Sequence, residues 1–242
     1  MLKLEGQIDR GDLHFKDTVL DGITAVGCGL SVDEEKRSTF DDCRFSKISA
    51  KKCVMGFPIF RRCTFRNVKS DFLGCYGTLF LECKLEGVIS GVNFALTTEW
   101  VPYSDLLNNE RIQAGLESIQ VTRQRIAFEN LAEAGRARYC LDVRDAIIAD
   151  VLFNDEAIVP KVLFNRGQCV IYKGSKLQEK LRAIFRAVKD RGLQSAFLPA
   201  LSRSQTVYLR SLESEGAAER IGEIKSLLAG QDIDLIEEPL CS

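Results

Sequence analysis

Three segments decide the fold of this chain: FDDCRFSKI at residues 40–48, FRRCTFRNV at 60–68 and FLECKLEGV at 80–88. The same residue types recur at the same places, with Phe first, Cys fourth and Phe or Leu sixth. Chance does not readily produce a pattern that returns every 20 residues without a slip. The first third of the chain therefore contains a structural repeat, which has to be recognised before any secondary structure is assigned.

The 20-residue repeat divides into four blocks of five, and the blocks extend from Leu13 to about residue 97. The first and third residues of nearly every block are apolar or small. In an extended chain these two positions point to the same side. A chain that turns a corner every five residues would close a square coil after four blocks. The block 33–37 puts Glu35 where a buried residue belongs, and we predict that it leaves the coil as a bulge or loop.

Over residues 13–97 the blocks resemble those of the pentapeptide-repeat family. The resemblance implies a right-handed quadrilateral parallel β-helix, with a large residue at the centre of each block and a small one two residues earlier. The predicted core ladder follows from matching residues to these two positions: Phe40, Phe45, Phe60, Phe65, Phe80 and Leu85 are large, and Cys43, Cys63 and Cys83 are small.

Residues 20 apart should lie one above another at the strand spacing of about 4.7–4.9 Å. This predicts two interior ladders of stacked residues. One consists of Leu20, Phe40, Phe60 and Phe80, and the other of Ala25, Phe45, Phe65 and Leu85. The two remaining sides are leaner: Leu30, Ala50, Ser70 and Ser90 on one, Met55, Cys75 and Ala95 on the other. Small neighbours let the large residues fill the axis.

The cysteine column Cys43, Cys63 and Cys83 could instead form a metal or redox site. The sequence has nine cysteines but no C-x-x-C, and its single histidine, His14, occupies an outward slot. Free cysteine is among the most buried residue types. We therefore interpret the column as small buried wedges, expect His14 on the surface, and predict no metal, no cofactor and no catalytic residue. No P-loop, G-x-G-x-x-G, G-x-S-x-G or H-E-x-x-H occurs.

Beyond residue 95 the five-residue pattern stops. We expect Trp100 to cover the last coil, a helix within 106–139 and a further helix over 142–153. Residues 160–242 predict a small ferredoxin-like βαββαβ domain, with strands at 169–172, 195–198, 205–209 and 233–236 and helices at 175–189 and 217–228. The predicted organisation is β + α/β: a β-helix (1–97), a helical linker or cap (98–159) and the α/β domain (160–242).

Charge distinguishes the C-terminal part. The net charge of -1 conceals 11 positive against 2 negative residues in 160–212. If Ile171 and Leu209 face the helices, Tyr172 and Tyr208 turn to the open face of the sheet, where aromatic and basic groups would suit single-stranded nucleic acid. The predicted binding residues are Tyr172, Lys173, Tyr208, Arg210, Arg182 and Arg186. The alternative is that the tyrosines pack and that the basic face is solvated or pairs with the acidic tail 213–238.

These observations predict a non-catalytic scaffold that binds another protein through a rigid β-helix and the α/β domain. Binding of single-stranded RNA or DNA through 160–212 is an alternative, and an enzyme with an unrecognised site in 100–242 is a second. The sequence also leaves open that the chain forms a homo-oligomer. Some pentapeptide-repeat proteins resemble acidic duplex DNA, but residues 1–95 carry 14 positive and 13 negative charges, a poor match to DNA. No apolar stretch of about 18 residues and no secretory signal is present, which favours a cytoplasmic protein without membrane contact.

Overall fold

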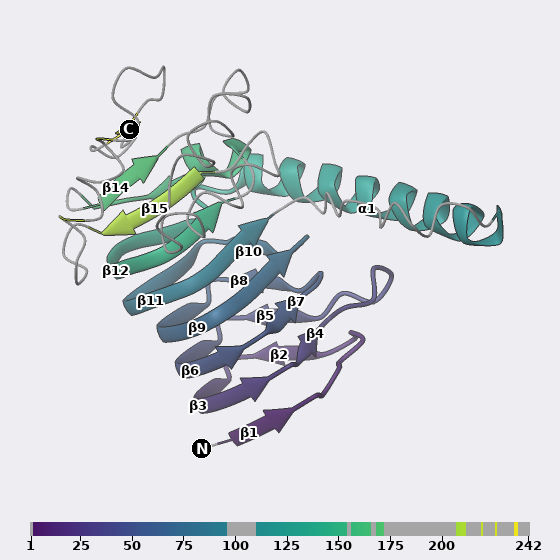
Figure 1. Ribbon diagram of the computed structural model, residues 1–242, viewed down its shortest axis with the longest axis horizontal. Coiled ribbons are helices and arrows are strands. Elements are labelled where there is room, and N and C mark those ends of the chain that lie inside the picture. The colour runs from purple at the N-terminus through teal and green to yellow at the C-terminus, as the bar shows by residue number, and fades with distance from the viewer. Residues whose placement is uncertain are drawn as a thin grey trace.

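The structure is a computed structural model that describes residues 2–95, 110–153, 156–165, 168–171, 207–211, 219, 226 and 235–236. Its N-terminal part is a stack of short strands, each paired in parallel with the strand one coil further along (Figure 1). The strands are β1 (Leu2–Glu5), β2 (His14–Lys16), β3 (Val19–Val26), β4 (Gly29–Leu30), β5 (Thr39–Asp41), β6 (Arg44–Lys51), β7 (Cys53–Met55), β8 (Ile59–Arg61), β9 (Thr64–Tyr76), β10 (Leu79–Leu81) and β11 (Cys83–Ala95). The parallel pairing of successive coils gives a β-helix-like fold.

The backbone turns at residues with a left-handed conformation that are spaced five apart. A positive φ is uncommon outside glycine, asparagine and aspartate, so its regular recurrence marks the corners of the coil. One strand and one corner together account for the five-residue period of the sequence. The corner residues include Asp17, Gly22, Gly27, Asp42, Lys47, Lys52, Arg62, Asn67, Glu82 and Gly87.

Phenylalanine rings stack along the interior. The ring centroids of Phe40 and Phe60 lie 4.8 Å apart and those of Phe60 and Phe80 lie 5.3 Å apart, both in stacked geometry. A second stack joins Phe45 to Phe65 at 4.8 Å and meets the first edge-on. Such aromatic pairs stabilise beyond the area that they bury. The residues of the predicted core ladder are all buried: Phe40, Phe45, Phe60, Phe65, Phe80, Leu85, Cys43, Cys63 and Cys83.

The first coil does not stack in the predicted register. β2 pairs with β5 so that Phe15 lies opposite Phe40, and β3 pairs with β6 so that Leu20 lies opposite Phe45. The prediction that Leu20 stacks below Phe40 is therefore wrong. The prediction that Ala25 stacks below Phe45 is wrong for the same reason. The cause is the block 33–37, which lies outside the strands as predicted and displaces this coil by one block.

The last predicted rung also differs. Phe94, rather than Ala95, pairs with Cys75, because two register shifts interrupt the pairing of β11 with β9. The Phe94 ring meets Phe80 edge-on at 5.2 Å and stacks on Phe153 at 5.3 Å. A large side chain thus fills the side of the coil on which small residues were expected.

Two elements follow the coil: α1 (Glu110–Arg136) and the long strand β12 (Leu141–Phe153). α1 confirms the helix predicted within 106–139. The helix predicted over 142–153 is wrong, because β12 pairs in parallel with β11 and continues the stack. Val143, Ile147 and Val151 lie four residues apart, a spacing that also suits a helix. The segment forms a strand because it pairs with the edge of β11, which would otherwise have no neighbouring strand.

The 3₁₀ helix η2 (Glu156–Lys161) leads to β13 (Val162–Leu163), which pairs with β12. Three more strands extend the same sheet: β14 (Gln168–Ile171), β15 (Val207–Ser211) and β16 (Leu235–Ile236). β15 pairs antiparallel with both β12 and β14, and β14 pairs antiparallel with β16.

Much of the predicted C-terminal domain lies outside the described residues. This holds for the helix at 175–189 and the strand at 195–198, and also for Trp100 with its predicted role as a lid. The ferredoxin-like arrangement and the division of the chain into three domains stay predictions.

Candidate interaction surfaces

The block 33–37 lies in a hydrogen-bonded loop between β4 and β5. The backbone N–H of Ser31 donates to Asp9 Oδ2 at 3.0 Å, and the buried Ser31 hydroxyl donates to the Lys36 carbonyl and accepts from the Ser38 N–H. Gly11 lies so close that a Cβ there would come within 1.6 Å of the Lys36 carbonyl oxygen. The loop therefore has one defined path out of the coil.

Arg37 links this loop to helix α1 through hydrogen bonds. Its Nε donates to the Phe57 carbonyl at 2.8 Å, and its Nη2 donates to the carbonyl of Gly77 at 3.4 Å and to Asn130 Oδ1 at 3.0 Å. Arg37, Phe57 and Gly77 lie 20 residues apart in the sequence, and through Arg37 the loop contacts the two coils that follow it. Burial lowers the pKa of Arg37 to about 10, so the guanidinium stays charged at neutral pH.

Further polar contacts attach the C-terminal half of α1. Asn130 is buried, and its Nδ2 donates to the Gly77 carbonyl at 2.9 Å. Glu34, in the loop, accepts from Arg123 Nε at 2.8 Å and from its Nη2 at 2.6 Å. Lys161 donates to the carbonyls of Gly135 and Ala137 at the C-terminal end of α1. A positive charge at this end stabilises a helix. Residues distant in sequence thus fix the helix.

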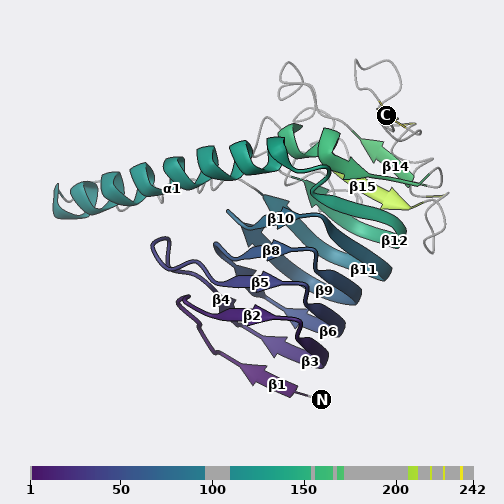
Figure 2. The same ribbon diagram turned by 180° about the vertical axis from the view of Figure 1, so that it is seen from behind.

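The two sides of α1 differ in exposure. Its coil-facing stripe is buried and consists of Ile126, Asn130 and Ala134, spaced four residues apart. The outer stripe is apolar but solvated: Val121 is 65% exposed, Phe128 75% and Leu131 38%. In Figures 1 and 2 the helix extends as an arm beyond the stacked strands. The outer stripe is the largest exposed apolar feature of α1 among the described residues.

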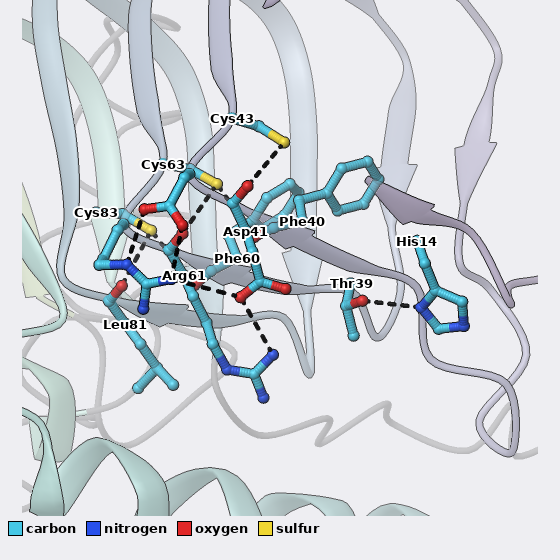
Figure 3. Close-up of polar contacts among 12 residues, drawn as sticks. His14, Thr39, Phe40, Asp41, Cys43, Phe60, Arg61, Cys63, Leu81 and Cys83 are labelled. Atoms are coloured by element: carbon cyan, nitrogen blue, oxygen red, sulfur yellow. Dashed lines mark hydrogen bonds and ion pairs between the residues drawn. The ribbon is translucent and has the colours of Figure 1, made fainter. Parts of the chain in front are cut away.

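The cysteine column lies inside the coil and faces backbone oxygens (Figure 3). The Cys63 thiol donates to the Phe40 carbonyl at 3.2 Å, and the Cys83 thiol donates to the Phe60 carbonyl at 3.4 Å. Burial raises the pKa of Cys83, which keeps its thiol neutral. The described part of the chain contains no group of three or more metal-ligating side chains placed to hold an ion. A neutral, buried, hydrogen-bonded thiol is a packing residue.

His14 lies exposed on β2, where a 2.8 Å hydrogen bond joins its Nδ1 to Thr39 Oγ1 (Figure 3). This is the surface position that the sequence predicted. Nearby, Arg61 and Asp41 form a half-buried ion pair at 3.7 Å. Ion pairs that solvent still reaches contribute little to stability.

The predicted nucleic-acid residues fall mostly beyond the described part of the chain. Tyr172, Lys173, Arg182 and Arg186 lie outside it, and so the binding hypothesis stays a prediction. Tyr208 and Arg210 belong to β15, whose backbone is described.

The register of β15 differs from the predicted arrangement in one respect. Tyr208 pairs directly with Ile171, and Arg210 pairs with Cys169. Directly paired residues share one face of a sheet. Ile171 and Tyr208, which the prediction placed on opposite faces, are therefore on the same face.

Sequence reasoning missed Arg37, Asn130 and the ion pair of Glu34 with Arg123. One signal was available, since the charged block 33–37 interrupts the repeat. Its partners lie about 90 residues further along, at separations of 93 and 89 residues. No local pattern links these positions.

Comparison with protein-family models, with curated proteins and with solved structures finds no significant match. In the described residues, no helix combines the length and the apolar character needed to cross a membrane.

Proposed function

We propose that residues 13–97 form a right-handed quadrilateral β-helix of the pentapeptide-repeat type and that the protein is a non-catalytic scaffold that binds another protein. Parallel pairing at 20-residue spacing and corners at five-residue spacing support the first part. In this proposal the protein acts through the rigid β-helix and through a C-terminal α/β domain.

The observation that carries the proposal is the outer stripe of α1. Val121, Phe128 and Leu131 lie at intervals of seven and three residues, which places them on one face of the helix. An exposed face with anchors at this spacing fits an apolar groove on a partner protein. Arg125 and Glu129 are exposed beside it and supply a charged rim.

Anchoring makes this face useful for binding. Arg37, Asn130 and the pair of Glu34 with Arg123 hold α1 against the coil before any partner arrives. A helix that is already ordered loses less conformational entropy on association. The rigid coil with a fixed arm is therefore suited to presenting a surface and gives no reason to expect a reaction.

The test uses a photo-crosslinking amino acid in place of Phe128 in the full chain, with the same replacement at exposed Lys51 on the coil as the control. We expect position 128 to capture one protein that position 51 does not. That protein, once purified, should bind the wild-type chain and bind Phe128→Glu at least about tenfold more weakly. Equal binding to both chains, or no capture specific to position 128, would contradict the proposal.

A further inference from the structure

The N-terminal end of the coil presents open strand edges. Among the described residues, β1 pairs only with β3 and β2 pairs only with β5, so each has one edge without a neighbouring strand. Figures 1 and 2 show β1 at the end of the stack opposite β12. An unpaired edge is a template for a further strand unless the sequence blocks it. No proline or β-bulge blocks β1, whose sequence is LKLE.

Apolar side chains gather at the same end. Ile8 is 67% exposed, and Leu2 is exposed as well. The phenylalanine stack also ends here, because Phe15 lies parallel to Phe40 at 5.5 Å and remains 36% exposed. Exposed apolar residues that cluster, rather than lie singly, indicate an interaction site. The end thus combines free backbone edges with apolar surface.

The charges on β1 identify what would cover it. Lys3 and Glu5 flank Leu4, and both charged side chains are exposed, whereas Leu4 is half-buried. Because strand residues alternate in direction, Lys3 and Glu5 share the outer face and Leu4 lies on the inner one. The ion pairs of the described residues include neither Lys3 nor Glu5.

This pattern is complementary to itself. An antiparallel pair of two β1 strands centred on Leu4 places Leu4 opposite its counterpart. It also places each Lys3 opposite the Glu5 of the other copy, so two ion pairs form by symmetry. A two-fold contact requires a patch that matches itself in this way. The two-fold axis runs normal to the sheet, so apolar inner faces join inner faces.

We propose that a second copy of this chain docks on the N-terminal end of the coil, with β1 pairing antiparallel to β1 so that two coils join end to end. The contact covers the exposed apolar residues of this end and continues the larger sheet across the dimer. It is separate from the outer stripe of α1, and the two surfaces can be occupied together.

Charge exchange tests the proposal in the full chain by sedimentation over a concentration series. The wild-type chain should form dimers. Lys3→Glu places two glutamates opposite each other, and Glu5→Lys places two lysines opposite each other, so each should weaken dimerisation by about tenfold or more. The double variant Lys3→Glu plus Glu5→Lys restores both ion pairs and should dimerise like the wild type.

The double variant has the same composition as the wild type, which makes it the matched control, and circular dichroism verifies that all variants fold. Phe128→Glu should leave the dimer unchanged. A monomeric wild type, single variants that dimerise as well as the wild type, a double variant that is not restored, or loss of the dimer in Phe128→Glu would each overturn the proposal.

Discussion

The coil and helix α1 are stabilised in opposite ways. The coil repeats one apolar contact on rung after rung, so Phe60 stacks between Phe40 and Phe80 and the same geometry recurs beside it. α1 is attached by the short buried stripe that holds Ile126 and Ala134 and by a few polar contacts, each made once. In these polar contacts Arg37, Asn130 and Glu34 reach across the fold. Repetition spreads stability over many residues, whereas attachment concentrates it in few.

The largest effect should come from the middle of the phenylalanine stack. Phe60→Ala removes a buried ring that contacts Phe40, Phe80 and Phe65, and we expect it to cost about 3–5 kcal/mol of unfolding free energy. Urea unfolding followed by circular dichroism measures the loss. Phe15→Ala, at the exposed end of the stack, is the control and should cost clearly less. Equal losses would mean that the stack does not carry the stability of the coil.

Arg37→Met should have the next largest effect, about 2–3 kcal/mol, because it removes the donor of three hydrogen bonds, to the Phe57 and Gly77 carbonyls and to Asn130 Oδ1. Hydrogen exchange should show faster exchange over residues 123–136, while the amides of β6 and β9 keep their protection. Arg62→Met removes a largely solvated ion pair with Asp42 and should change stability by no more than about 1 kcal/mol. Unchanged exchange in α1 would show that Arg37 does not anchor the helix.

A smaller effect is expected where the loop pairs with α1. Glu34→Gln weakens a half-buried ion pair with Arg123 and should cost about 1 kcal/mol, measured by urea unfolding at low and high salt. Arg125→Gln removes an exposed pair within the helix and should cost about 0.3–0.5 kcal/mol. If the two losses matched, the loop would contribute nothing beyond an ordinary surface pair.

The last prediction is a pH dependence and concerns the strand β12. Hydrogen bonds from Arg144 lower the pKa of the Asp142 carboxyl below its ordinary value. Its stabilisation is therefore complete above the ordinary carboxyl pKa and is lost as the pH falls through the lowered one. Asp142→Asn should flatten the acid limb of a plot of unfolding free energy against pH. Arg144→Met should flatten the same limb, and the double variant should add little. Additive slopes would contradict this pairing.

The repeat made the core of the coil predictable. Phe40, Phe60 and Phe80 have equivalent neighbours on every coil, so one local pattern, read three times, assigned their burial. The first coil was predicted one block out of register. The sequence shows that block 33–37 breaks the pattern, but it does not show that this block is skipped when the first coil stacks on the second. The strand β12 was predicted as a helix, since its apolar spacing suits both.

The 20-residue coil, the interior phenylalanines and the small cysteines beside them could be predicted from the repeat alone, because they depend on residues close together in the chain. Other features come from long-range packing. Lys47, Arg62 and Glu82 adopt a left-handed backbone that glycine usually favours. The strand β12 pairs with β11, and Arg37 contacts Asn130. The five-residue pattern marks where the corners fall, but pairing between strands enforces the left-handed backbone at residues other than glycine. Contacts across some 90 residues fix α1, and they leave no local pattern in the sequence.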